Sequence, residues 1–242
     1  MAHGAKDWSK YGAGGERYSL QDMAELAARL GSPVTYDRRG EVLWYDRMQD
    51  GTSAWEVSSG GTGGAGESVG EKTFWPGFAL KLTAGSTSTH LVNLSRWFSP
   101  SAPGKFGLEA SVWLTAAFES FDLFIYSIYG DVSTISSIRL NKDPLELQYY
   151  GSDGLYHTVA EIAQFYQSNM MYVTAKFVGD FVTGEYIRAL FGRTEYDLTG
   201  TPMQVGAGSG TENNRAVLRF TGRSGFNDTC QIGNVVYTVN EP

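Results

Sequence analysis

The sequence is short of cysteine, of charge and of long hydrophobic runs. Among its 242 residues Cys230 is the single cysteine, which excludes an internal disulfide. We expect Cys230, at the start of an apolar strand, to be a small buried side chain and not a reactive thiol. Charged residues make up 19% of the chain, so long solvated helices should be few. No segment approaches 18 apolar residues, and residues 1–30 hold no continuous apolar run of signal-peptide length. We therefore expect neither a membrane partner nor classical export.

Basic residues are too few and too scattered for a nucleic-acid surface. The 19 Lys and Arg residues stand against 26 Asp and Glu residues, giving a net charge of −7. A phosphate backbone would be repelled by such a chain. The densest basic stretch, Arg38-Arg39, lies beside Asp37 and Glu41, so its charge is offset locally.

Aromatic residues and glycine are plentiful, at 14% and 30 residues respectively. Aromatic-rich segments separated by glycine-rich turns predict an all-β fold. Residues 106–116 and 171–179 alternate apolar and polar side chains, which is typical of an antiparallel sheet with one packed face. Residues 121–129 are apolar on both faces, which predicts a central strand. We predict strands at about 79–84, 89–98, 106–116, 121–129, 135–140, 145–150, 171–179, 185–191, 216–221 and 232–239.

For three further segments the sequence predicts a hairpin, a loop, and a short helix or covering loop. Residues 34–36 and 42–45 flank a turn and predict a hairpin. The glycine–serine segment 58–70 predicts a flexible surface loop. Residues 159–167 are consistent with a short helix or a covering loop. The overall expectation is one antiparallel β-sandwich, a jelly roll, over residues 33–242.

The first 32 residues differ from the rest and form a predicted docking segment. Residues 1–18 are polar and glycine-rich, and they cannot bury enough apolar surface to order alone. Ser19 caps a predicted helix over about 20–30, which Gly31 and Pro33 end. So short a helix is marginal in water, so its apolar stripe should pack on the sandwich, on a neighbouring subunit or on a larger assembly. The candidate docking residues are Trp8, Tyr11, Tyr18, Leu20, Met23, Ala27 and Leu30.

Catalytic constellations are hard to find. Glycoside hydrolysis needs two carboxyl groups roughly 5–10 Å apart, and the candidate pairs are Glu195 with Asp197 and Glu119 with Asp122. Neither pair lies inside a convincing strand, and both are expected to be solvated turn acids. No strand–turn–helix context is predicted that could hold a G-x-S-x-G nucleophile, and there is no metal-ligand spacing of His or Cys and no P-loop; the glycine-rich segment 206–210 is expected to be a loop. His90 and His157 are expected to be hydrogen-bonded structural residues. We predict no catalytic residues, hence no enzyme.

Two kinds of ligand remain open. No cofactor is expected, but a structural calcium ion could use turn oxygens, although turn propensity also explains these residues. The turn candidates are Asp131, Asn141, Asp143, Asp153, Asn227 and Asp228. Glycan binding needs aromatic platforms, although an aromatic on a strand is more often packed in a core. The candidate stacking residues are Trp75, Trp97, Trp113, Tyr149, Tyr150 and Tyr156.

Two stretches resemble concanavalin A-like, laminin-G-like jelly rolls. In residues 172–202 a strand ends at Asp180, a tight turn follows at Thr183-Gly184, and the return strand carries Tyr186 and Arg188. Residues 225–239 resemble the closing strand of the same sandwiches. Many of these have a pair of acids in that strand that helps to bind calcium; Gly233-Asn234 stands here instead.

The layout of the whole chain is similar to proteins of bacteriophages and related viral genomes. It consists of the arm, the helix with residues 30–40 after it, and a sandwich ending at residues 240–242. The resemblance implies a virion structural protein, such as a capsid decoration or tail-associated protein, that docks on capsid or other virion proteins and assembles as a homo-oligomer, most naturally a trimer. A carbohydrate-binding module or adhesin is the first alternative, and a glycoside hydrolase of the same fold the second. Because fold does not fix function, all three readings stay open.

Overall fold

The computed structural model describes residues 39–69, 79–87, 90–99, 102–115, 117–162, 172–208 and 210–242. From Arg39 onward the chain forms one compact unit. None of the described residues lies in a helix, and so none belongs to a helix that could span a membrane. The predicted arm, the predicted helix at 20–30, the strand at 34–36 and every candidate docking residue fall outside the described residues, as does Trp75.

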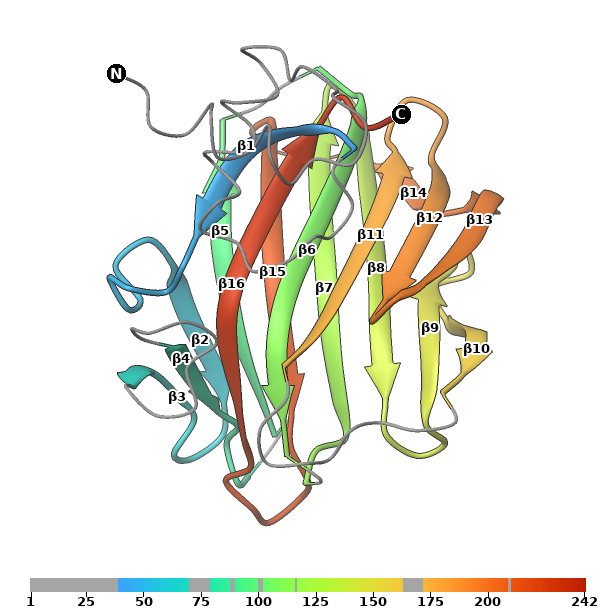
Figure 1. Cartoon of the computed structure of the whole chain (residues 1–242). Helices are drawn as coiled ribbons and strands as arrows, with labels where there is room; N and C mark the ends of the chain where they lie inside the picture. Colours follow the sequence, from blue (N-terminus) through green and yellow to red (C-terminus); the bar gives the residue numbers. More distant parts are fainter. Residues whose placement is uncertain are drawn as a thin grey trace, which may run out of the picture. The chain divides into compact units, whose positions relative to one another are not determined.

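The unit is an antiparallel β-sandwich, which confirms the predicted fold class (Figure 1). We call its two eight-stranded sheets sheet A and sheet B. Sheet A contains β1 (Glu41–Asp46), β3 (Ala65–Val69), β4 (Ala79–Thr83), β6 (Lys105–Leu114), β11 (Val173–Asp180), β12 (Glu185–Phe191), β13 (Thr194–Pro202) and β16 (Thr229–Val239). Sheet B contains β2 (Glu56–Gly60), β5 (Leu91–Phe98), β7 (Ser120–Tyr129), β8 (Val132–Asn141), β9 (Glu146–Tyr150), β10 (Tyr156–Glu161), β14 (Gln204–Ala207) and β15 (Asn213–Thr221).

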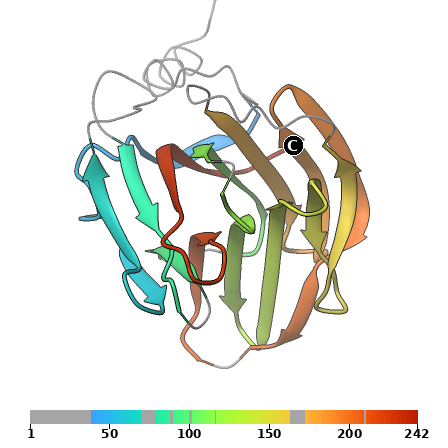
Figure 2. The ribbon, with the colours of Figure 1, turned by 90° about the horizontal axis from the view of Figure 1, so that it is seen from below.

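In each sheet one long strand pairs, along the same edge, with two short strands in succession. Sheet A runs in the order β13-β12-β11-β6-β16-β4-β3, and β16 pairs with β4 along its first residues and with β1 along its last. Sheet B runs in the order β10-β9-β8-β7-β15-β5-β2, and β8 pairs with β14 before it pairs with β9. In Figure 1 the strands β16, β6 and β11 of sheet A lie in front of sheet B, and Figure 2 shows the same strands from below.

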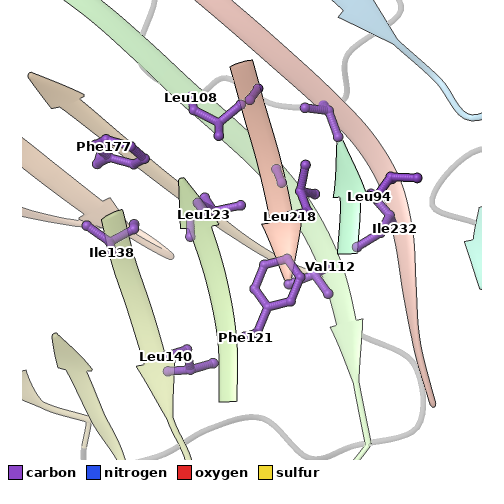
Figure 3. Packing of buried hydrophobic residues seen from close by; sticks show 14 of the residues in the cluster. Leu94, Leu108, Val112, Phe121, Leu123, Ile138, Leu140, Phe177, Leu218 and Ile232 are labelled. Carbon is purple, nitrogen blue, oxygen red and sulfur yellow. The ribbon is translucent and has the colours of Figure 1, made fainter. Parts of the chain in front are cut away.

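The core lies between the sheets and is built by alternation. Leu108 and Val112 of β6 and Phe177 of β11 meet Leu123 of β7 and Leu218 of β15 (Figure 3). Burying such a side chain contributes about 1.5–3 kcal/mol to the free energy of folding. The strand β7 is flanked by β15 and β8 in the middle of sheet B, which confirms the predicted central strand.

The glycine–serine segment is not the loop that we predicted. Residues 56–60 form β2 of sheet B and residues 65–69 form β3 of sheet A, so the chain crosses between the sheets at residues 61–64. Gly61 has φ +94°, and a Cβ atom there would lie 1.7 Å from the carbonyl oxygen of Thr87. The glycine therefore permits the chain to pass close to Thr87. From composition alone we had interpreted the glycine content as a sign of flexibility.

One other expectation about a loop is wrong, and two strands were not predicted. Residues 156–161 form β10, so the segment 159–167 begins as a strand and not as a helix or covering loop. Residues 194–202 and 204–207 form β13 and β14, which were not predicted. Both strands are short of apolar residues and pair at the sheet margins, where pairing rather than hydrophobic burial determines the structure.

The polar face of sheet A is not open to solvent, contrary to the simple reading of its alternation. Ser111 on β6 and Lys176 on β11 are fully buried. The hydroxyls of Ser111 and Thr174 lie 2.5 Å apart, and Lys176 Nζ donates to Glu241 Oε1 at 2.6 Å. Polar side chains can be buried in this way when they hydrogen-bond to one another.

Candidate functional site

The outward face of sheet B carries a mixture of aromatic and charged side chains. On β7, Leu123 and Ile125 belong to the core between the sheets. Successive side chains of a strand point to opposite faces, so Asp122, Phe124 and Tyr126 point outward. This outward face of sheet B is the surface that we call the outer face.

Strand register aligns further outward side chains with those of β7. Arg219 of β15 lies opposite Asp122, and Arg215 lies opposite Tyr126. On the next strand, β5, Trp97 lies opposite Arg215. Side chains that face each other across antiparallel strands are in contact distance. The outer face thus places arginines between aromatic rings.

Asp122 is the centre of a buried hydrogen-bonded cluster. Its Oδ1 accepts the Nε–H of Arg139 at 2.5 Å and the hydroxyl of Tyr156 at 2.9 Å, while its Oδ2 accepts the Ser120 hydroxyl at 3.3 Å. The Arg139 guanidinium also lies 3.6 Å from the centre of the Tyr156 ring. Burial, together with the nearby Asp122 charge, raises the pKa of Tyr156, so its hydroxyl stays protonated and donates. Both oxygens of Asp122 are therefore occupied by structural bonds.

The expectation of solvated turn acids is wrong for Asp122 and half right for the other pair. Asp122 is buried inside β7. Glu195 and Asp197 are exposed, but they lie within β13 and not at a turn. Glu195 binds both terminal nitrogens of Arg39 at 3.1 and 2.6 Å, and Asp197 accepts the backbone N–H of Thr199 at 2.9 Å. These contacts give both acids structural roles.

Arg215 lies between two aromatic rings. Its guanidinium carbon is 4.8 Å from the ring centre of Trp97 and 4.6 Å from that of Tyr126. Trp97 is 49% exposed, and its indole N–H donates to Glu56 Oε2 at 3.1 Å. The hydrogen bond fixes the plane of an exposed ring, so the ring is presented to solvent in one orientation.

Arg219 repeats the arrangement four residues further along β15. Its guanidinium carbon lies 4.7 Å from the ring centre of Phe124, and its Nε–H donates to Asn93 Oδ1 at 2.9 Å. Phe124 and Tyr126 stack with ring centres 5.5 Å apart. The two arginines are therefore held by a continuous aromatic layer.

The structure separates the predicted stacking residues. Trp97, Tyr150 and Tyr156 lie on the outer face, and the rings of Tyr150 and Tyr156 are 5.1 Å apart. Tyr149, their neighbour in the chain, points the other way and packs on the core. Trp113 lies in sheet A and is only 4% exposed, so its ring is not presented to solvent.

Sequence reasoning missed four outer-face residues: Phe124, Tyr126, Arg215 and Arg219. The two aromatics were hidden in a segment that is apolar on both faces. The arginines had a usable signal, because Arg215 and Arg219 are separated by an even number of residues and must share one face of a strand.

Other reactive side chains of the described residues have structural partners or are buried. Burial raises the pKa of the Cys230 thiol well above its usual value, and the residue is fully buried, as predicted. His157 stacks on Tyr149 and hydrogen-bonds Asp153 at 2.9 Å, which confirms a structural role. In the described ranges no three His, Cys, Asp or Glu side chains converge as metal ligands do. Several calcium candidates instead bind protein groups: Asn141 the Pro144 carbonyl, Asn227 the Ala84 carbonyl and Asp228 the Arg223 side chain.

A hollow of about 400 Å³ also opens between the sheets, away from the outer face. Tyr129, Val132, Phe181 and Val182 supply most of its apolar lining. No charged side chain lines the hollow, so it has no group that could form an ion pair with a ligand. The outer face of sheet B is the stronger candidate site.

No family model and no curated protein matches the sequence. Solved structures match in fold. A conserved carbohydrate esterase from the Shiga toxin-encoding bacteriophage phi24B is 14% identical, with 84% of this chain covering 100% of that one at a TM-score of 0.57. A Bacillus licheniformis β-glucanase is 14% identical over 81% of this chain and 97% of its own, with a TM-score of 0.47. The carbohydrate recognition domain of Emp46p is 11% identical over 81% and 93%, with a TM-score of 0.48.

At such identities these likenesses establish the fold and nothing finer. The protein is an all-β sandwich of the concanavalin A-like type, as the resemblance in the sequence implied. Because one fold can carry unrelated functions, function has to be argued from the site.

Proposed function

We propose that the protein is a non-catalytic carbohydrate-binding module whose ligand lies on the outer face of sheet B. The observation that carries the proposal is the exposed Trp97 ring, fixed by Glu56 and continued by Arg215 and Tyr126. Sugar rings stack on such platforms through their C–H faces, and neighbouring polar groups bind the hydroxyls. Asn93 and Gln148 lie on the same face and supply amide groups of that kind.

Binding is favoured over hydrolysis because the outer face lacks a suitable carboxylate pair among its described residues. Asp122 has both oxygens occupied by Arg139, Tyr156 and Ser120. Glu146 is two strands away, about 10 Å by strand spacing, and it accepts the Thr158 hydroxyl at 2.8 Å. A retaining glycosidase needs a separation of about 5 Å, and an inverting one needs room for a water between free acids.

The bacteriophage protein of similar fold is named as a carbohydrate esterase, which supports carbohydrate as the ligand class. Esterase chemistry needs an activated nucleophile. The G-x-S-x-G match at residues 66–70 places Ser68 inside strand β3 and not at a strand-to-helix turn, so the support extends to the ligand and not to the reaction.

Glycan-array binding tests the proposal. Trp97→Ala should abolish the binding of the array's best ligand, because the variant removes the exposed platform. Phe226→Ala is the matched control, since Phe226 is equally exposed (53%) but lies on the loop before β16. A silent array, or equal loss in both variants, would overturn the proposal. Release of sugar or acyl groups from the bound ligand would replace it with an enzyme.

We also propose that this binding takes place on a virion, where the protein is a capsid decoration or tail-associated component. The support is the layout of the sequence, in which a polar arm and a capped apolar stripe precede the sandwich. Under this proposal the partners are capsid or other virion proteins and copies of this chain. Deletion of residues 1–32 should abolish co-purification with intact particles. Unchanged copy number on the particles would contradict the docking role.

A further inference from the structure

The arginines of the outer face gather on its central strands. The chain carries a net charge of −7. The outward positions of β7, β8 and β15 nevertheless hold three arginines, Arg139, Arg215 and Arg219, against one carboxylate, Asp122. The two further carboxylates of this face, Glu56 and Glu146, lie on the flanking strands β2 and β9. Arginines gathered on the central strands create a local field there that attracts anions.

The three arginines are not equivalent, because only one of them is neutralised. Arg139 pairs with Asp122 at 2.5 Å. Arg219 donates its Nε–H to the neutral amide of Asn93. Within the described ranges no carboxylate lies at ion-pair distance from Arg215 or Arg219, and the buried Nε–H of Arg215 has no acceptor. Two arginines without an ion-pair partner among the described residues therefore lie on the proposed binding face.

Aromatic stacking prepares these two arginines to bind an anion. The guanidinium carbon of Arg215 lies within 5 Å of the ring centres of both Trp97 (4.8 Å) and Tyr126 (4.6 Å), and that of Arg219 lies 4.7 Å from the ring centre of Phe124. A planar guanidinium held by rings keeps its edge N–H groups free to form paired hydrogen bonds with a carboxylate or sulfate. Little side-chain entropy remains to be lost when such a bond forms.

We propose that the ligand of the outer face is an acidic glycan. This inference rests on the proposed carbohydrate-binding function. A carboxylate or sulfate of the glycan binds the guanidinium of Arg215 while the same or the next sugar ring stacks on Trp97. Arg219 lies about 13 Å along the strand from Arg215, farther than one monosaccharide spans, so it meets a charge on another unit of the chain. A polymer with repeated charges fits this spacing, and a single charged sugar does not.

Matched polysaccharides separate charge from sugar identity. The first pair is polygalacturonate and its fully methyl-esterified form, and the second is chondroitin sulfate and desulfated chondroitin. Calorimetric titration of the full chain with each member should show binding to the acidic member of at least one pair and weaker binding to its neutral or less charged partner. The responding pair then identifies carboxylate or sulfate as the anion. Added salt should weaken the interaction.

Variants then assign the effect to the arginines. Arg215→Met should weaken binding of the acidic polymer by about tenfold or more, the value of one charge-assisted hydrogen bond pair. If Arg215→Met does not fold, Arg219→Met replaces it as the test variant, because this substitution removes a contact with only one aromatic ring. The control is Arg193→Met, at an exposed turn of sheet A between β12 and β13. Equal losses in the Arg215 and Arg193 variants would overturn the inference.

The outcomes also separate this inference from the function on which it rests. If acidic and esterified polymers bind equally, and Trp97→Ala abolishes both, the carbohydrate-binding function stands and the acidic ligand is wrong. If no polysaccharide in either pair and no glycan on an array binds, both proposals fail.

Discussion

The hydroxyl of Tyr186, on β12 of sheet A, donates to the carbonyl oxygen of Tyr150, on β9 of sheet B, at 2.9 Å. The same hydroxyl accepts the backbone N–H of Ser137 on β8 at 2.8 Å. The β8–β9 ladder ends one residue earlier, at Ile138 and Tyr149. Tyr186 thus inserts its hydroxyl where the ladder stops and satisfies two backbone groups of the other sheet.

Removal of this hydroxyl should destabilise the sandwich. In Tyr186→Phe the Ser137 N–H and the Tyr150 carbonyl lose a buried partner, so the free energy of unfolding should fall by about 1–3 kcal/mol. Tyr237 provides the matched control. It is equally buried (1% exposed), but its hydroxyl has no hydrogen-bond partner among the described residues. Tyr237→Phe should therefore leave stability unchanged or raise it. Urea unfolding of both variants measures the difference, and equal losses would contradict the assignment.

We expect the Asp122 cluster to contribute to the stability of the sandwich and not directly to glycan binding. Asp122→Asn keeps the shape of the side chain but removes the charge that faces Arg139, which should cost about 3 kcal/mol. The control is Asp131→Asn, at an exposed turn between β7 and β8. Thermal and urea unfolding should show a large loss for Asp122→Asn alone. A stable Asp122→Asn protein that has lost glycan binding would instead make Asp122 a ligand-binding residue.

The strands that the sequence predicted well are those whose burial is visible as a pattern. Residues 185–191 were placed correctly because the Thr183-Gly184 turn precedes them and apolar residues follow. The strands β2, β3, β13 and β14 have no such signal, because they are glycine-rich or polar and depend on pairing with β5, β4, β12 and β8. Pairing of this kind is a tertiary property that local propensity does not contain.

The site could be predicted only in part, for a related reason. Tyr149 and Tyr150 are adjacent, and a sequence cannot say which of them faces outward unless the register of β9 is known. Trp97 was identified, but its partners Arg215 and Tyr126 come from two other strands. Their meeting depends on the β5–β15–β7 register, in which Trp97, Arg215 and Tyr126 form one row.

A buried ionic cluster near the end of β16 should also contribute to stability. Glu241 is fully buried, accepts hydrogen bonds from Lys176 at 2.6 Å and Thr238 at 2.5 Å, and pairs with Arg188. Glu241→Gln removes the negative charge that faces both cations, so the free energy of unfolding should fall by about 3 kcal/mol or more. Glu119→Gln, at an exposed bend, is the control. An unchanged urea midpoint in Glu241→Gln would mean that the cluster adds nothing to stability.

The hydrogen bonds of the Asp228 carboxylate lead us to expect a specific pH dependence of the free energy of unfolding. Its carboxylate is 8% exposed and accepts the Arg223 backbone N–H at 2.8 Å, the side-chain Nε–H at 3.0 Å and the Nη2–H at 2.9 Å. Burial acts to raise the pKa of Asp228, but the hydrogen bonds from Arg223 outweigh it and hold the pKa below its usual 3.8. The unfolded chain therefore binds the proton more readily than the folded one.

The sign of the effect follows from this difference. The stabilisation by Asp228 is fully present above the unfolded pKa and is lost as the pH falls through the folded pKa. The difference in free energy of unfolding between the wild type and Asp228→Asn should accordingly be constant near neutral pH and shrink from about pH 5 to about pH 3. Urea unfolding of both proteins across this range measures it, with Asp50→Asn, at an exposed turn, as the control. A difference that stays constant down to pH 3 would mean that the Arg223 pairing does not favour the ionised carboxylate in the folded state.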